Sequence, residues 1–297
     1  MTTPDLGRPV PLRPALTEAT ATLAAVGVES PRWDAEQLVA HVLGVARTSL
    51  VTVPNLDPAQ HDELQRLVAR RAAREPLQHI VGSVGFRFIE LAVGPGVFIP
   101  RPESESVAGW AIDAARNAGV PHPRVVDLCA GSAAIALSIA HEVPSAEVHA
   151  VELDEGALEW ARRNAAARER AGDPPVTLHH ADVAHAVPEL DGTVDVVVSN
   201  PPYVAEHELE DVDPEVREHD PHVALVAGPE GLDVIREVER TAKRLLRPGG
   251  SVVVEHSDRQ GESVPAVFAE AGGWAGIADH PDLVGRPRFT VATKITT

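Results

Sequence analysis

An α/β fold with a mostly parallel sheet is predicted by the alternation of strand and helix patterns along the second part of this sequence. From residue 124 onward, short apolar runs alternate with stretches of helical periodicity. Strands covered by helices on both faces have this texture, because neither side of them meets water. The expected strands cover residues 124–128, 147–152, 176–180, 194–199 and 251–255, and the expected helices cover 132–141, 155–171 and 231–246. We expect a last strand, at the edge of the sheet, over residues 288–293.

The region before this sheet has a helical pattern, with no strong strand candidate between residues 14 and 74. Ser30-Pro31 and Asp57-Pro58 mark two helix starts, because each pairs a polar cap with a proline at the first helical position. Closely spaced Gly, Val and Phe residues then predict a β-hairpin over residues 84–89 and 91–93. The expected organisation is a helical domain over residues 1–76, a hairpin linker over 77–104 and the α/β domain over 105–297.

Composition narrows the class of protein. The 297 residues include 44 acidic and 26 basic side chains, for a formal charge of −18. Tight binding to nucleic acid depends on basic contacts to phosphate, so this balance favours a small-molecule or protein substrate without direct nucleic-acid contact. Cys129 is the single cysteine, which excludes an intrachain disulfide. We find no signal peptide and no membrane span in the sequence, and we expect a cytoplasmic monomer.

Asn200-Pro201-Pro202-Tyr203 directly follows the apolar run over residues 194–199. Two prolines allow neither a helix nor a strand ladder to continue, so the Asn is presented at the carboxyl end of a buried strand, where open α/β sheets bind ligands. The Asn200 side-chain oxygen and the Pro201 carbonyl can each accept a hydrogen bond, which suits a planar NH2 group. Tyr203 adds an aromatic face beside them. An ordinary turn that ends the strand is the alternative interpretation.

Three more segments at strand ends have residues suited to an adenosine. The strand that contains Asp127 runs into Cys129-Ala130-Gly131-Ser132, where small residues allow close backbone approach and a new helix offers free N–H groups. Glu152 ends the next strand, about 20 residues beyond the loop, where an acid can take the two hydroxyls of a ribose. Asp182 follows the third strand, and its carboxylate suits the exocyclic amine of adenine. The loop alone is also compatible with a structural turn, so the prediction depends on these residues and Asn200 together.

These motifs, in this order, resemble those of class I S-adenosylmethionine-dependent methyltransferases. Two further segments narrow the likeness to the HemK/PrmC family: Arg-Glu-Pro-Leu-Gln-His-Ile at residues 74–80, and Phe-Ile-Pro-Arg-Pro-Glu-Ser-Glu at 98–105. Shorter matches follow at Asp220-Pro221 through Leu225, at Gly228, at Gly231-Leu232, at Asp282-Leu283 and at Gly285-Arg286. The resemblance covers nearly the whole chain, including the helical front domain.

The resemblance implies a Rossmann-like methyltransferase domain with a seven-stranded, mostly parallel sheet, preceded by a helical domain that helps bind the substrate. The implied reaction transfers a methyl group from S-adenosylmethionine, leaving S-adenosylhomocysteine, to the side-chain amide of the glutamine in the Gly-Gly-Gln motif of peptide chain release factors. The expected cofactor contacts are Asp127, Cys129, Ala130, Gly131, Ser132, Ala133, Glu152, Asp182, Val183 and Asn200. Asn200, Pro201 and Tyr203 are the expected catalytic residues, Pro202 and Phe98 complete the substrate pocket, and no metal is expected.

Two departures from the family pattern are visible. The family has glycine where this chain has Cys129 and Ala133, and if either position needs a positive φ, its side chain costs roughly 1 kcal/mol or more. Val183 stands where some relatives have a tryptophan against the adenine. Three alternatives stay open from the sequence: a ribosomal-protein glutamine methyltransferase, a nucleic-acid adenine methyltransferase, and a non-catalytic binding protein of the same fold.

The remaining polar features predict less. The acidic segment over residues 206–220 is compatible with a solvated loop, or with a mobile lid that meets a basic release factor surface. The fourteen histidines have no metal-ligand spacing, so we expect structural roles for them. Cys129 has no evident paired base, and we expect it to be a small loop residue.

Overall fold

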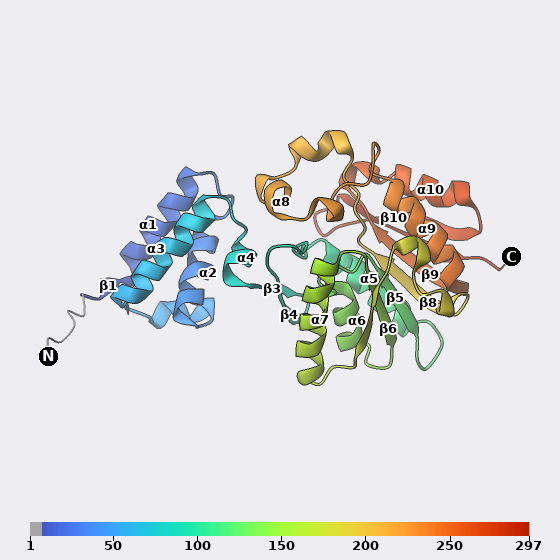
Figure 1. Ribbon diagram of the computed structural model, residues 1–297, viewed down its shortest axis with the longest axis horizontal. Coiled ribbons are helices and arrows are strands. Elements are labelled where there is room, and N and C mark those ends of the chain that lie inside the picture. Colours follow the sequence, from blue (N-terminus) through green and yellow to red (C-terminus); the bar gives the residue numbers. More distant parts are fainter. Residues whose placement is uncertain (1–7, 297) are drawn as a thin grey trace. The chain divides into compact units, whose positions relative to one another are not determined.

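The computed structural model describes residues 8–296, which form two compact units with a boundary after Gly82. The first unit is helical and the second contains the sheet (Figure 1). Each unit has its own hydrophobic core, so each can be described by itself.

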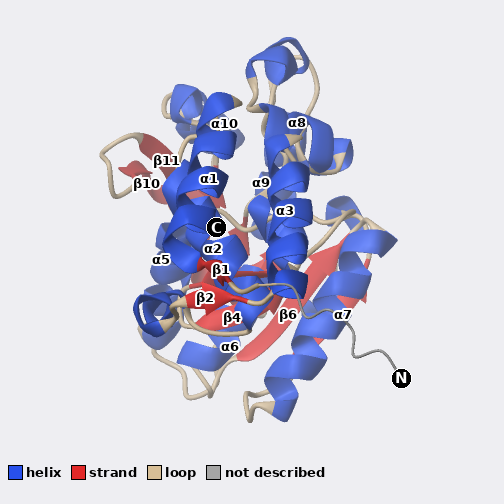
Figure 2. Ribbon diagram, turned by 90° about the vertical axis from the view of Figure 1, so that its left-hand side faces the viewer, coloured by secondary structure: helices blue, strands red, loops and turns tan. Residues whose placement is uncertain are grey.

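The helical unit consists of α1 (Leu12–Ala25), α2 (Pro31–Leu43), α3 (Pro58–Ala72) and α4 (Leu77–Val81), with a 3₁₀ turn over Arg47–Thr52. Its first three helices pack side by side (Figures 1 and 2) around buried leucines that include Leu23, Leu38 and Leu64. The predicted start of α3 is confirmed: the Asp57 side chain accepts from the Gln60 backbone and the Gln60 side chain accepts from the Asp57 backbone. One expectation was wrong, because Asn55–Leu56 forms a short strand, β2, that pairs with β1 (Val10–Pro11).

The second unit opens on the predicted hairpin, β3 (Ser83–Phe86) and β4 (Ile89–Ala92). Its turn lies at Arg87-Phe88 rather than at Glu90, and Arg87 adopts a positive φ of 51° there. Asn164 of α7 (Glu155–Arg170) connects the hairpin to the sheet domain, because its side chain accepts from the Ala92 N–H and donates to the Ala92 carbonyl.

A seven-stranded sheet in the order β10-β11-β9-β8-β5-β6-β7 confirms the predicted fold class. The strands are β5 (Arg124–Leu128), β6 (Glu147–Glu152), β7 (Val176–His180), β8 (Val194–Ser199), β9 (Leu246–Glu255), β10 (Trp274–Pro281) and β11 (Pro287–Lys294). Strands β5 to β9 run parallel to one another. Strand β11 is antiparallel to its neighbours β9 and β10, so it is the one reversed strand of this sheet. The strand expected at 288–293 exists, but its edge position was wrong, because β10 lies outside it.

Helices cover both faces of the sheet, as Figure 1 shows. They are α5 (Ser104–Arg116), α6 (Ala134–Glu142), α7 (Glu155–Arg170), α9 (Asp233–Leu245) and α10 (Ser263–Ala271). Successive residues of one strand serve opposite cores: Val125 packs with α5, α6 and α7, whereas Val126 packs with α9 and α10. This two-sided burial explains why most residues of these strands are apolar. No helix within residues 8–296 is long and apolar enough to cross a membrane.

The strand order places a reversal at the centre of the sheet. From β5 the chain proceeds outward through β6 and β7, then returns to β8 on the other side of β5. A crevice therefore opens at the carboxyl ends of β5 and β8, which is where ligands bind in sheets of this kind. Asn200 immediately follows Ser199, the last residue of β8.

Candidate active site

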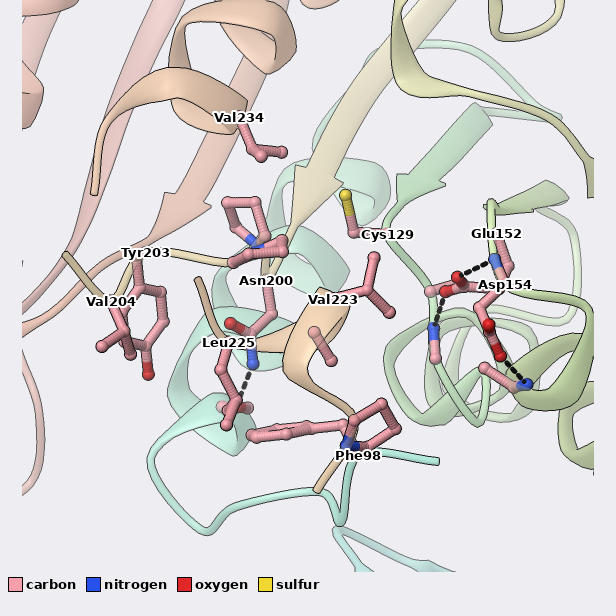
Figure 3. A pocket seen from close by; sticks show the side chains of 18 of the residues that line it. Phe98, Cys129, Glu152, Asp154, Asn200, Tyr203, Val204, Val223, Leu225 and Val234 are labelled. Carbon is pink, nitrogen blue, oxygen red and sulfur yellow. Dashed lines mark hydrogen bonds between the residues drawn. The ribbon is translucent and has the colours of Figure 1, made fainter. Parts of the chain in front are cut away.

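A cavity of about 580 Å³ opens at this crevice. It is lined by every residue predicted for the site except Ala133: Phe98, Asp127, Cys129, Ala130, Gly131, Ser132, Glu152, Asp182, Val183, Asn200, Pro201, Pro202 and Tyr203. Figure 3 shows Glu152 and Asp154 toward one end of the cavity and Asn200 and Tyr203 toward the other, with Cys129 and Val223 between them. Segments from four strand ends therefore meet at one site.

The loop after β5 holds three residues in the left-handed conformation. Cys129, Gly131 and Ala133 have φ angles of 60°, 56° and 63°, so both positions that lost a family glycine do carry a positive φ. A side chain there costs roughly 1–2 kcal/mol of strain. The Ala133 methyl is fully buried in the core behind the loop, which explains why this residue does not line the cavity.

Glu152 fixes the loop that passes beside it. Its two carboxylate oxygens accept from the backbone N–H groups of Gly131 (2.7 Å) and Asp154 (2.8 Å). Burial raises the pKa of Glu152, and these backbone hydrogen bonds counteract the shift. Each carboxylate oxygen has a second lone pair, so Glu152 can still accept from the two hydroxyls of a ribose. At the end of β7, Asp182 Oδ1 accepts from the Ala184 N–H (2.8 Å).

Asp127 is a buried acid that lines the cavity. Its Oδ2 accepts from the Ala136 N–H (3.1 Å), while Oδ1 is buried and has no partner within residues 8–296. Burial raises the pKa of Asp127 to about 8. A buried, partly unsatisfied carboxyl of this kind is suited to a cationic ligand, which would favour its ionised form.

Cys129 faces the same cavity as a neutral thiol. Burial raises its pKa, and the nearby charge of Glu152 adds to the shift. Thiol nucleophiles act as thiolates, so this environment opposes a nucleophilic or redox role. The structure agrees with a small loop residue at this position.

The other end of the cavity is built around Asn200. Its Nδ2 donates to the Ser104 Oγ at 3.1 Å, which leaves Oδ1 as the amide atom available to a ligand (Figure 3). Within residues 8–296, neither Asn200 Oδ1 nor the Pro201 carbonyl accepts a hydrogen bond. Two adjacent acceptors without donors can hold the two N–H groups of one planar NH2.

The turn that carries Tyr203 is fixed by its backbone. The N–H groups of Tyr203 and Val204 both donate to the Leu225 carbonyl (3.2 and 2.8 Å), and Gln260 Nε2 donates to the Tyr203 carbonyl (3.2 Å). Gly231, at φ 70°, approaches so closely that a Cβ there would lie 2.2 Å from the Tyr203 carbonyl oxygen. Only glycine fits at that position, and the Asn-Pro-Pro-Tyr turn is held in one conformation.

Sequence reasoning missed several residues that complete the site. The segment that follows the Asn-Pro-Pro-Tyr turn contains a helix, α8 (Pro214–His219). Three valines of this segment, Val212, Val216 and Val223, line the cavity. Asp220, whose side chain is fully buried, accepts from Arg101 (2.6 Å), and the Arg101 guanidinium lies 5.1 Å from the Phe98 ring. The family match at Asp220-Pro221 was the only signal for this contact.

Comparisons with known proteins agree with this geometry. The family model "PrmC N-terminal domain" matches residues 14–82, and the model "Methyltransferase small domain" matches residues 114–216. The chain is similar in fold to the hMettl16 catalytic domain, with a TM-score of 0.53 and 14% identity over 69% of this chain and 75% of that one. That likeness supports the methyltransferase fold alone.

Curated relatives extend over nearly the whole chain. A release factor glutamine methyltransferase of Streptomyces coelicolor is 58% identical and covers 94% of this chain and 96% of its own. A 4-amino-L-phenylalanine/4-methylamino-L-phenylalanine methyltransferase of Streptomyces pristinaespiralis is 42% identical and covers 91% of both chains. The resemblance seen in the sequence is thereby confirmed, and the chain belongs to the family of release factor glutamine methyltransferases.

Proposed function

We propose that this protein transfers the methyl group of S-adenosylmethionine to the side-chain amide nitrogen of the glutamine in the Gly-Gly-Gln motif of peptide chain release factors. The observation that carries the proposal is the orientation of Asn200, whose Nδ2 is held by Ser104. Its Oδ1 and the Pro201 carbonyl then form a pair of acceptors, with the Tyr203 ring in the same cavity wall. A primary amide is the group that this pair fits.

The remaining cavity residues fit the proposed cofactor. Glu152 suits the ribose hydroxyls, Asp182 the adenine amine, and the unsatisfied Asp127 Oδ1 a cationic group. The left-handed turns of the loop bring backbone close to the same space. S-adenosylmethionine supplies an electrophilic methyl group on a positively charged sulfur.

The main task of the protein in this reaction is to position the amide nitrogen against the methyl group. An amide nitrogen is a weak nucleophile, because its lone pair is delocalised into the carbonyl. Asn200 Oδ1 and the Pro201 carbonyl would bind its two N–H groups and direct the nitrogen at the methyl carbon, so that the new N–C bond forms as the C–S bond breaks. Orientation of this kind accounts for a large part of enzymatic rate gains, and the same acceptors stabilise the positive charge that develops on nitrogen. The nitrogen then loses one proton.

A second candidate function is methylation of a small aryl amine, favoured by the relative that methylates 4-amino-L-phenylalanine. An aryl amine also presents an NH2 group next to a flat system. The 58% identity to a release factor enzyme favours the protein substrate. We further propose that the protein acts in the cytoplasm, as a monomer, without direct contact to nucleic acid; the charge of −18 supports the last point.

The two functions separate in one assay. Recombinant release factor and 4-aminophenylalanine are each incubated with methyl-labelled S-adenosylmethionine at equal enzyme concentration. We expect label in the release factor and none above background in the amino acid. Label in the amino acid alone would assign the chain to small-amine chemistry.

We also propose that the helical unit docks the release factor. Every residue that lines the cavity lies beyond residue 83, and the helical unit has a separate core, so the cofactor site does not depend on it. Residues 83–297 alone should therefore bind S-adenosylmethionine about as tightly as the full chain. They should methylate a short Gly-Gly-Gln peptide at a similar rate, but a whole release factor much more slowly. Equal turnover of the whole release factor by both forms would rule out a docking role.

A further inference from the structure

Two segments far apart in the chain hold the Asn-Pro-Pro-Tyr turn. At one end of the turn, Asn200 Nδ2 donates to the Ser104 Oγ (3.1 Å). At the other end, the Tyr203 N–H donates to the Leu225 carbonyl (3.2 Å). Figure 3 shows Leu225 and Asn200 toward the same end of the cavity. The geometry of the amide site therefore depends on how the segments that carry Ser104 and Leu225 are placed against each other.

An ion pair joins these two segments. Arg101 Nη2 donates to Asp220 Oδ2 over 2.6 Å, across 119 residues of sequence. The Asp220 side chain is fully buried, whereas 29% of the Arg101 side chain is exposed. Within residues 8–296, the Arg101 guanidinium forms no other hydrogen bond. This contact is therefore the one that its planar cation makes with a charged partner.

Short turns connect the ion pair to the groups that hold the Asn-Pro-Pro-Tyr turn. On one side, the Ser104 N–H donates to the Arg101 carbonyl (3.1 Å). On the other side, successive 3₁₀ hydrogen bonds fold residues 221–225 into a compact turn between Asp220 and Leu225. The ion pair therefore closes a chain of contacts that begins and ends at the Asn-Pro-Pro-Tyr turn.

The same guanidinium also restrains an aromatic wall of the cavity. It lies 5.1 Å from the centre of the Phe98 ring, within the range of a cation–π interaction. Both Phe98 and Arg101 line the cavity. Because Asp220 fixes the guanidinium, it also limits the positions that the Phe98 ring can take.

We propose that Arg101 and Asp220 are positioning residues: their ion pair fixes residues 98–104 against residues 220–225, and so sets the amide acceptors and the Phe98 ring for the substrate nitrogen. The inference rests on the proposed amide methylation, because it assigns the pair a role in that reaction. Neither side chain needs to touch the reacting atoms. A displacement of about 1 Å in a substrate-holding group can slow a reaction by about 100-fold.

Asp220→Asn tests this link, because it keeps the shape of the side chain and removes the charge that holds Arg101. At saturating S-adenosylmethionine, kcat for a short Gly-Gly-Gln peptide should fall by about 10-fold. The KM for the peptide and the dissociation constant for the cofactor should stay nearly unchanged. A loss confined to kcat is typical of a group that acts on orientation in the transition state.

Variants of Arg101 test whether the two residues act as a pair. Arg101→Gln should lose as much rate as Asp220→Asn, and the double variant should lose no more, because each substitution breaks the same link. Arg101→Lys keeps a cation for Asp220 and should retain an intermediate rate. The Arg101 series also serves as the test if Asp220→Asn does not fold. Losses that multiply in the double variant would show that the residues act independently, and would overturn the proposal.

Asp195→Asn is the matched control for stability. Asp195 is also buried and pairs with Arg247 at 2.6 Å, and Arg247 is 35% exposed at its side chain. Neither residue lines the cavity. This variant should have a lower melting temperature, as Asp220→Asn should, but the wild-type kcat. An equal loss of kcat in Asp195→Asn would reduce the effect to general stability and contradict the proposal.

A second measurement does not depend on methyl transfer. Tyr203 is the single tyrosine of the chain, so labelling with ¹⁵N-tyrosine gives one backbone amide signal, from the N–H that donates to Leu225. This signal should shift in Asp220→Asn and stay in place in Asp195→Asn. An unchanged signal in Asp220→Asn would refute the link. A shifted signal, in a protein that methylates no release factor, would refute the proposed function and leave the link intact.

Discussion

Asn200→Ala is expected to slow methyl transfer to a release factor by about 100-fold or more. The substitution removes one of the two acceptors that hold the substrate nitrogen in line, and losses of this size follow when positioning or charge-stabilising groups are removed. Cofactor binding should change much less, because Glu152 ends β6 and Asp182 follows β7, away from the Asn200 turn. Single-turnover assays with labelled S-adenosylmethionine, together with calorimetric binding, measure both quantities.

Two further variants sharpen this test. Asn117→Ala is the matched control, since Asn117 is exposed at the end of α5 and donates only to a carbonyl of its own helix; it should transfer methyl at the wild-type rate. Asn200→Asp keeps an acceptor and adds a negative charge, so we expect residual activity between those of the wild type and Asn200→Ala. Undiminished transfer by Asn200→Ala would show that this side chain does not orient the amide.

Glu152→Ala should weaken S-adenosylmethionine binding by about 1–3 kcal/mol, or roughly 5- to 150-fold. Two charge-assisted hydrogen bonds to the ribose would be lost, and the Gly131 and Asp154 N–H groups would lose their acceptor. Isothermal titration calorimetry gives the dissociation constant directly. Glu155→Ala, three residues later and exposed, should bind like the wild type. An unchanged constant for Glu152→Ala would remove this residue from the site.

The parallel core and the site around it were predictable because local sequence determines them. Successive residues such as Val125 and Val126 lie on opposite faces of the strand, and both are apolar. This pattern specifies a strand between two helical layers. The carboxyl ends of parallel strands share one edge, so residues as distant in the chain as Glu152 and Asn200 could be assigned to one site from the sequence alone.

Other features depend on contacts that leave little trace in the sequence. Strand β10 was missed because it lies at the edge and only Trp274 of its eight residues is buried, so it lacks an apolar run. The resulting error put β11 at the edge. The ion pair between Arg101 and Asp220 joins segments more than a hundred residues apart in the chain. The direction of the Asn200 amide depends on Ser104, which no local pattern could supply.

The central claim is that this cavity methylates a glutamine amide, and peptide mass mapping of the product tests it most directly. A release factor and its Gly-Gly-Ala variant are incubated with the enzyme and S-adenosylmethionine, digested and analysed by tandem mass spectrometry. We predict a single added methyl group on the glutamine of the Gly-Gly-Gln peptide, and none on the variant. Equal methylation of both proteins, or a methyl group on any other residue, would contradict the account.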